Sequence, residues 1–471
     1  MSTDQRNLTV ENIVQSVKAG SLSAEGVTAQ ALTSIENIDG EVNAFTDVTA
    51  ERALTEARAV DLALTEGKNL PLAGVPYAVK NLFDIEGTTT RAGSKINREN
   101  PPAIADAALI SRLKSAGAVL VGGLNMGEFA YDFTGENVHD GNCKNPHDLT
   151  RMTGGSSSGS GGSVASGMVP VSLGSDTNGS IRVPSSFCGL FGLKPTFGRL
   201  SRAGTYPFVG DLDHLGPIAR SAKDLALFFD VMQGIDPKDP AQVDKPVLAT
   251  TPELSKRADG LRVAIAGGYF RQKCMPEALL AVDLVAATLG ATVEIDIPEA
   301  ARARASAYVI TTSQSAELHL DRLQKRAEDF DPDTRDRFLS GAMVPAVWTQ
   351  KAQRFRSWFQ TAMREIFKHT DILLAPATPC HAIPSETKTI ILDGEELPAR
   401  ANIGLFTQPI SFIGLPVVVA PVWLDGAKLP IGVQVIAPAW REDLALRVAH
   451  DLQEKGVSSA PVTNIKQQAI S

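Results

Sequence analysis

Hydrophobic residues in the first part of the chain recur with the three- and four-residue spacing of amphipathic helices. Three such stripes lie within 10–17, 27–35 and 54–64. Thr9 and Ser23 immediately precede the first two stripes, and both residue types accept hydrogen bonds from the first turn of a helix. The pattern therefore predicts a helical N-terminal part over about residues 1–66.

After Gly67 the pattern changes to short apolar runs that alternate with amphipathic segments. The run LAGVPYAVK predicts a strand that ends at Lys80, and Asp106 is the predicted N-cap of the helix that follows. Further strands are predicted at AVLVG, VPVSLGSDT, LRVAIAGG, ATVEIDIP, DILLAPATP and LPVVVAPVW. Such alternation predicts an α/β fold in which helices surround a mixed, mostly parallel β-sheet.

The return of strand-like segments near the C-terminus predicts one intertwined domain over residues 1–471 rather than separate units. After the helical part, the pattern predicts a core over about 70–225 and a second α/β and helical part over about 226–471. Polar helices are expected across 300–369.

Composition narrows the possible partners. The formal net charge is −8, and lysine and arginine are scattered, so neither nucleic acid nor an anionic membrane is an expected partner. The most apolar stretch, 412–422, is short and contains two prolines, so no membrane span is expected. The start lacks the apolar region of a secretory signal. No C-x-x-C or paired histidine spacing occurs. We therefore expect a cytoplasmic protein without a metal or other cofactor.

Residues 154–167, GGSSSGSGGSVASG, are crowded with glycine and serine. A flexible linker is one interpretation. A phosphate-binding loop, as in a small-molecule kinase, is another, although the Walker motif is missing. The stretch also matches G-x-S-x-G, but a polar segment stands where that nucleophile elbow needs a strand. A fourth interpretation is a catalytic serine in a triad without histidine.

The fourth interpretation is favoured by a longer pattern. The segment 154–196, GGSSSGSGGSVASGMVPVSLGSDTNGSIRVPSSFCGLFGLKPT, resembles the signature of the amidase-signature family. Upstream, LAGVPYAVKNLFDIEG is similar to the family's lysine strand, and GDLDHLGPIARSAKDLAL and LPIGVQVIA are similar to its later blocks. The resemblance extends over about residues 5–455 and implies hydrolysis of an amide with release of ammonia.

The resemblance implies a role for each catalytic position. It makes Ser180 the nucleophile, Ser156 the cis-peptide serine that relays the proton, and Lys80 the base. It further implies an oxyanion hole that is formed by the backbone amides of Thr177, Asn178, Gly179 and Ser180. Lysine can accept a proton near neutral pH only if burial keeps it uncharged, and the apolar strand before Lys80 would provide that burial. Asp176 and Arg182 are expected to brace the turn.

One position departs from the family pattern, because Asn178 stands where most members have glycine. Either this position has a positive φ, which asparagine tolerates, or its side chain reaches into the pocket and contacts the substrate. Within the family, several blocks resemble enzymes whose small substrate carries a carboxylate. Arg337 is the candidate to bind that carboxylate, and a solvated charge run at 335–337 is the alternative.

The family also contains glutamine-hydrolysing amidotransferase subunits and general aliphatic or aryl amidases, which remain alternatives. As partners, the resemblance implies a small accessory subunit together with a dimer of the large subunit, which would form a heterotetramer.

Overall fold

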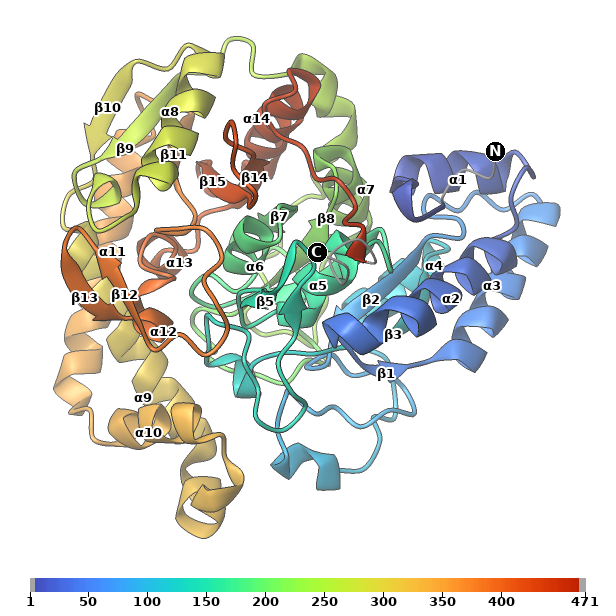
Figure 1. The fold of residues 1–471 in the computed structure, drawn as a ribbon, viewed down its shortest axis with the longest axis horizontal. Helices are drawn as coiled ribbons and strands as arrows, with labels where there is room; N and C mark the ends of the chain where they lie inside the picture. Colours follow the sequence, from blue (N-terminus) through green and yellow to red (C-terminus); the bar gives the residue numbers. More distant parts are fainter. Residues whose placement is uncertain (1–4, 466–471) are drawn as a thin grey trace.

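The computed structural model describes residues 5–465, and within that range a single sheet of eleven strands crosses the molecule (Figure 1). In spatial order its strands are β1 (Phe45–Val48), β3 (Val119–Leu124), β2 (Pro76–Lys80), β6 (Val171–Asp176), β8 (His214–Ala219), β7 (Phe191–Lys194), β14 (Val417–Val422), β15 (Ile431–Ile436), β11 (Ile372–Pro376), β9 (Val263–Gly267) and β10 (Val293–Asp296). Two small hairpins lie outside it: β4 (Lys144–Asn145) with β5 (Asp148–Met152), and β12 (Thr389–Leu392) with β13 (Glu395–Pro398).

The sheet is mixed, which confirms the α/β class. The parallel pairs lie in two flanking groups, β3–β2–β6 and β11–β9–β10. The strands between these groups, from β6 through β8, β7, β14 and β15 to β11, pair antiparallel, so the expected parallel arrangement does not extend through the middle. The connection from β14 to β15 covers only residues 423–430, which is too short for the crossover that parallel neighbours require. Because one sheet contains strands from both halves of the chain, we propose that the chain forms one domain.

The three helices expected at the N-terminus are present as α1 (Val10–Lys18), α2 (Ala24–Val42) and α3 (Ala50–Thr65). Thr9 accepts a hydrogen bond from the backbone N–H of Asn12, and Ser23 accepts one from the N–H of Gly26, so both predicted caps are confirmed. The expected cap of α4 (Ala108–Ser115) is wrong, because Ala107 occupies the N-cap position. Asp106 instead binds the guanidinium of Arg52 through both carboxylate oxygens, at 2.7 and 2.6 Å.

Some of the remaining α-helices pack against the sheet, and others pack on one another or on a small hairpin beside it (Figure 1). They are α5 (Ser158–Ala165), α6 (Arg182–Phe187), α7 (Ala222–Met232), α8 (Pro276–Leu289), α9 (Ala300–Arg326), α10 (Pro332–Ala342), α11 (Ala346–Ile366), α12 (Ala399–Asn402), α13 (Gln408–Phe412) and α14 (Glu442–Glu454). Short 3-10 helices lie in the connections at Gln5–Asn7, Ile96–Glu99, Glu128–Ala130, Thr251–Lys256, Gly268–Arg271 and Ala327–Asp329.

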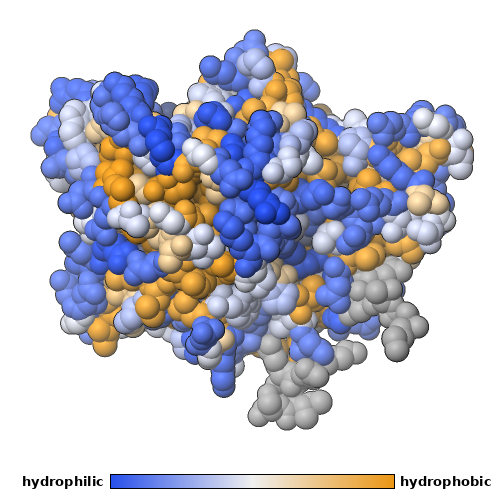
Figure 2. All heavy atoms as spheres, turned by 90° about the horizontal axis from the view of Figure 1, so that it is seen from above, coloured by the Kyte–Doolittle hydropathy of each residue, from blue (hydrophilic) through white to orange (hydrophobic). Residues whose placement is uncertain are grey.

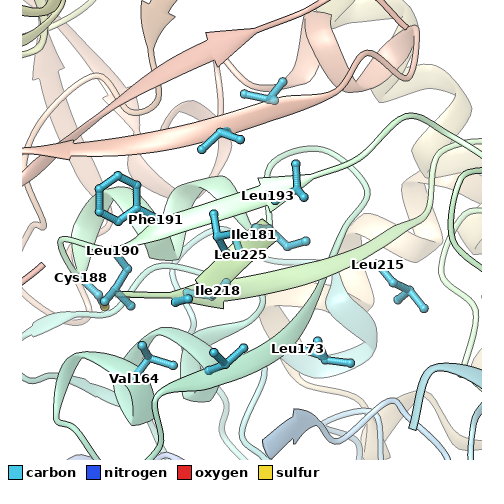
Figure 3. Close-up of a cluster of buried hydrophobic side chains, with 14 of the residues drawn as sticks. Val164, Leu173, Ile181, Cys188, Leu190, Phe191, Leu193, Leu215, Ile218 and Leu225 are labelled. Atoms are coloured by element: carbon cyan, nitrogen blue, oxygen red, sulfur yellow. The ribbon is translucent and has the colours of Figure 1, made fainter. Parts of the chain in front are cut away.

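The signature segment contributes its own side chains to the hydrophobic core (Figure 3). Leu173 on β6, Leu193 on β7 and Ile218 on β8 are buried there, together with Val164 on α5. Cys188 lies among them as a buried free thiol, as expected from its apolar sequence context. Burial of this much apolar surface fixes the position of α5 relative to the end of β6.

Some hydrophobic side chains remain on the surface. Figure 2 shows such a region on the side where α8 and β10 lie in Figure 1. Leu280, Leu284 and Val293 are exposed on these two elements, and β10 is an edge strand of the sheet. None of the helices within residues 5–465 combines the length and the apolar character that crossing a membrane requires.

Candidate active site

Lys80 is the last residue of β2, a strand that is buried along its whole length. Its amine is fully buried, and this burial lowers the pKa of Lys80 to about 7, because the charged form loses its hydration. Nearby carboxylates, of which Asp176 has the largest effect, act in the opposite direction. A lysine with a pKa near neutrality can exist as a free amine and accept a proton.

The Lys80 amine binds two serine hydroxyls. Its Nζ donates to Ser156 Oγ at 2.6 Å and to Ser175 Oγ at 2.9 Å. The peptide bond between Gly155 and Ser156 is cis. The structure thus brings together Lys80 and Ser156, which are 76 residues apart in the sequence.

The glycine- and serine-rich stretch is ordered and buried, so the linker interpretation is wrong. Much of it forms α5, and every residue of that helix is buried. Glycine permits this packing: a Cβ on Gly159 would lie 2.3 Å from the carbonyl oxygen of Ala44 and 2.6 Å from the amide nitrogen of Asn125. The stretch therefore fixes the position of Ser156 at the start of the helix.

A sharp turn after β6 carries Ser180. The backbone N–H groups of residues 177–180 donate to no acceptor within the described chain, although the surrounding amides are paired. Gly179 has a φ of +151°, and a Cβ there would lie 2.2 Å from Thr407 Oγ1. Thr407 Oγ1 also donates to the carbonyl oxygen of Asn178 at 2.6 Å. Neighbouring N–H groups without internal partners can stabilise an oxyanion.

Asp176 and Arg182 brace this turn, as expected. Arg182 donates to both oxygens of Asp176, at 3.0 and 2.9 Å, and both side chains are fully buried. Although burial acts to raise it, the guanidinium of Arg182 holds the pKa of Asp176 well below its ordinary value. Asp176 also accepts the backbone N–H of Ile181 at 3.1 Å. Arg182 in turn donates to Gln434 Oε1 at 2.7 Å, which ties the turn to β15.

Ser180 lies in a narrow pocket at the end of the sheet and is 3 % exposed. The pocket is lined by Ala130, Tyr131, Asp132, Phe133, Thr177, Asn178, Ser180, Phe208, Tyr308, Thr311, Arg337 and Gln408. Among the hydrogen bonds of residues 5–465, Ser156 Oγ is bound to Lys80 and not to Ser180. Catalytic hydrogen bonds often tighten only when substrate is bound, so this arrangement is compatible with proton transfer between the two serines.

Comparison with known proteins gives the family. Residues 26–446 match the model of the Amidase family. The chain belongs to the amidase family.

Two groups of relatives cover nearly the whole amidase chain. It is 54 % identical to AtzE, a 1-carboxybiuret hydrolase subunit of Pseudomonas sp. strain ADP, over 96 % of this chain and 99 % of that one. It is 34 % identical to a glutamyl-tRNA(Gln) amidotransferase subunit of Chromohalobacter salexigens, over 95 % of this chain and 96 % of that one.

Solved structures of similar proteins support the same family assignment. One belongs to a study of a vestigial protein complex and the evolutionary origins of an s-triazine catabolic enzyme, and it superposes with a TM-score of 0.95 at 53 % identity, over 96 % of this chain and all of that one. The corresponding glutamyl-tRNA(Gln) amidotransferase subunit of Thermotoga maritima superposes with a TM-score of 0.82 at 27 % identity, over 99 % of each chain. The predicted resemblance is thus confirmed, and the protein is a hydrolase that acts on amide C–N bonds. The kinase interpretation of the glycine-rich loop is not supported.

The amidase departs from its family pattern at Asn178, and the structure decides between the two interpretations. Asn178 is not one of the residues with a positive φ. Its side chain instead lines the pocket, where Nδ2 donates to Thr311 Oγ1 at 2.9 Å. The asparagine is therefore part of the pocket wall rather than a substitute for glycine in a strained turn.

Arg337 also lines the pocket of the amidase. Its Nη1 donates to the carbonyl oxygen of Tyr131 at 2.9 Å, and its guanidinium lies 4.3 Å from the centre of the Tyr131 ring. No carboxylate of the described residues lies within 4.0 Å of it. Arg335, two positions earlier, forms the surface ion pairs of this charge run, with Glu328 and Asp336. The two arginines of α10 thus lie in different surroundings.

Sequence reasoning missed three residues of this amidase site. Ser175 binds Lys80, Thr407 supports the turn, and Thr311 holds Asn178. Ser175 lies inside the signature, so its position just before Asp176 could have indicated a contact with the lysine strand. Thr407 begins the block TQPISF, whose resemblance to related enzymes could have marked it, whereas Thr311 lies in a segment without a distinctive pattern.

Two of the histidines, His214 and His139, form polar contacts within the protein. His214 Nδ1 lies 3.0 Å from the carbonyl oxygen of Asp176 and 2.6 Å from that of Leu212. His139 Nε2 lies 3.1 Å from Glu128 Oε1. Within residues 5–465, no group of three or more histidine, cysteine, aspartate or glutamate side chains is arranged to hold a metal ion.

Proposed function

We propose that Ser180, Ser156 and Lys80 hydrolyse the amide through an acyl-enzyme. The observation that supports this most directly is the 2.6 Å contact between Lys80 Nζ and Ser156 Oγ at a buried amine with a pKa of about 7. A serine hydroxyl is a weak nucleophile unless a base takes its proton. Here the base is Lys80, and Ser156 conducts the proton to it.

The reaction proceeds in two halves. Ser180 Oγ attacks the carbonyl carbon while its proton passes to Ser156, whose own proton passes to Lys80. The N–H groups of residues 177–180 stabilise the negative oxygen, and removing one such donor typically costs about 3 kcal/mol of transition-state stabilisation. The C–N bond then breaks as Ser156 returns a proton to the leaving nitrogen, and ammonia departs. Water attacks the acyl-enzyme by the same route and restores Ser180.

We further propose that the substrate is 1-carboxybiuret, which would lose ammonia to give a dicarboxylated urea in the breakdown of cyanuric acid and other s-triazines. The support is the 54 % identity to a 1-carboxybiuret hydrolase subunit over nearly the full length. In the pocket, Arg337 provides a guanidinium without a carboxylate partner among the described residues, and a substrate carboxylate can take that place.

A substrate panel tests this proposal. Ammonia release is measured with 1-carboxybiuret, biuret, glutamine and simple aliphatic and aryl amides. The proposal expects the largest kcat/KM for 1-carboxybiuret. Preference for glutamine would favour an amidotransferase subunit, for which the 34 % identity to the Chromohalobacter salexigens protein is the supporting observation, and a broad preference for neutral amides would favour a general amidase. A fluorophosphonate probe checks the mechanism, since the adduct is expected on Ser180.

We also propose that a small accessory subunit joins a dimer of this chain, so that two copies of each form a heterotetramer. The support is the similarity to an enzyme that was solved in the context of a vestigial protein complex. Co-expression with a candidate small subunit, followed by co-purification and light scattering, is expected to give the mass of two copies of each chain. If this chain remains a monomer both with and without the small subunit, the proposal is contradicted.

A further inference from the structure

Only one of the two polar atoms in the Asn178 side-chain amide forms a hydrogen bond within the described residues. Its Nδ2 donates to Thr311, while its Oδ1 is buried and accepts no hydrogen bond within the described chain. Asn178 is 7 % exposed and lines the pocket that holds Ser180. Buried polar atoms without a partner are uncommon because they lose hydration without compensation. An unsatisfied acceptor beside a reactive serine indicates a ligand that brings an N–H donor.

The surrounding elements show which part of a ligand would meet this acceptor. Lys80 and Ser156 lie on β2 and at the start of α5, so the leaving nitrogen must face that side to receive its proton from Ser156. Thr311 and Arg337 lie on α9 and α10, two helices that pack against each other. Because Asn178, Thr311 and Arg337 line the pocket whereas Lys80 and Ser156 do not, we expect the acyl part of the substrate, which stays on Ser180, to extend toward Asn178 and Arg337.

We propose that Asn178 Oδ1 accepts a hydrogen bond from an N–H attached to the scissile carbonyl on its acyl side, so that this site selects ureido compounds over amides that carry a carbon there. This inference rests on the proposed hydrolysis at Ser180. Thr311 fixes the amide of Asn178 through Nδ2 and thereby presents the acceptor oxygen. An analogue without the N–H leaves Oδ1 buried and unpaired, which is the situation in which hydrogen-bonding sites discriminate most strongly.

A matched pair of substrates isolates this hydrogen bond. Allophanate and malonamate both carry a terminal primary amide and a carboxylate. They differ in the group between them, which is N–H in allophanate and methylene in malonamate. The native enzyme is expected to show a kcat/KM for ammonia release that is about tenfold or more higher for allophanate, which corresponds to about 1.4 kcal/mol of transition-state stabilisation. The ratio of the two values is the measured quantity.

Variants then assign the ratio to Asn178. Asn178→Gly, which restores the residue common in the family, is expected to lower the ratio to below about three, because the acceptor is gone. Thr311→Val is expected to lower it as well, since the amide loses its anchor, and Thr311→Ser is expected to keep it. Thr312→Val is the matched control: Thr312 is equally buried but donates to the carbonyl oxygen of Tyr308 on its own helix, so the ratio should not change.

The outcomes separate the two proposals. Equal native values for allophanate and malonamate, or a ratio that Asn178→Gly leaves intact, overturn the role of Asn178 while hydrolysis at Ser180 stands. Turnover of neither compound also overturns it, because a site that reads this N–H should accept allophanate. If ammonia release persists in Ser180→Ala, the proposed mechanism fails instead. Ser180 labelling by a fluorophosphonate in Asn178→Gly shows that the variant retains a formed nucleophile.

Discussion

The fully buried residues that support Ser180 and the residues that line its pocket form two groups, called here the first wall and the second wall, and these groups are built differently. On one side, Lys80, Ser156 and the Asp176–Arg182 pair are fully buried, and their polar groups are bound within the protein. On the other side, Asn178, which lies in the turn after β6 and is held by Thr311 of α9, has an acceptor oxygen without a partner among the described residues, and Arg337 of α10 is a cation without a carboxylate among them. The first wall is complete without substrate, and the second requires substrate to complete it. We infer that the residues of the first wall carry out the reaction and that the residues of the second wall determine which substrate is bound.

The strongest test of this division is Ser180→Ala. If the first wall performs the reaction, loss of the nucleophile is expected to lower kcat by roughly 10⁴-fold or more. KM should change far less, because the second wall is intact. Ammonia release under saturating substrate measures the effect. Activity within about tenfold of the native enzyme would mean that another group attacks the carbonyl.

A second test breaks the brace of the first wall. Arg182→Met removes the partner of a fully buried carboxylate, and leaving such a charge unpaired typically costs about 3–5 kcal/mol. Urea unfolding monitored by circular dichroism should show the lower free energy of unfolding. Arg335→Ala is the control, since its ion pairs lie at the surface and are expected to contribute less than about 1 kcal/mol. Similar losses in both variants would show that the brace has no special role.

A third test addresses the second wall alone. Arg337→Ala is expected to raise KM for carboxylated substrates by roughly 10- to 100-fold, the effect of losing a hydrogen bond to a charged group. Neutral amides should change little, since they have no carboxylate to bind. Steady-state kinetics on 1-carboxybiuret and on a simple amide measure the difference. An equal increase for both would remove Arg337 as the carboxylate-binding residue.

The smallest expected effect is the pH dependence of the first wall. Because burial lowers the pKa of Lys80 to about 7, the neutral amine becomes more abundant as the pH rises through that value. The kcat/KM should therefore increase about tenfold between about pH 6 and pH 8 and then level off. A profile that continues to rise toward the ordinary lysine pKa would show that Lys80 is not the base or is not shifted.

The same division explains what could be predicted from the sequence. Lys80, Ser156 and Ser180 were named through the family resemblance, and each lies in a local segment with a strong pattern: an apolar strand, a glycine-dense helix start and a tight turn. Asn178 and Arg337 of the second wall were also named as candidates from the sequence, but the contact that holds Asn178, with Thr311 at a distance of 133 positions, was not. No spacing rule links such positions. The predicted cap at Asp106 failed for a similar reason, because a distant arginine, Arg52, competes for the carboxylate.

The turn at Gly179 is pressed against Thr407, and Arg182 beside it is held by Gln434. All three proposed catalytic residues lie in the first 180 positions of the chain, yet two of the residues that hold the oxyanion turn, Thr407 and Gln434, lie beyond position 400. A growing chain that ends before Thr407 therefore contains Lys80, Ser156 and Ser180, but it lacks the residues that hold the turn at Gly179. Hydrolytic competence is therefore expected only after the chain through Gln434 on β15 has been synthesised and folded.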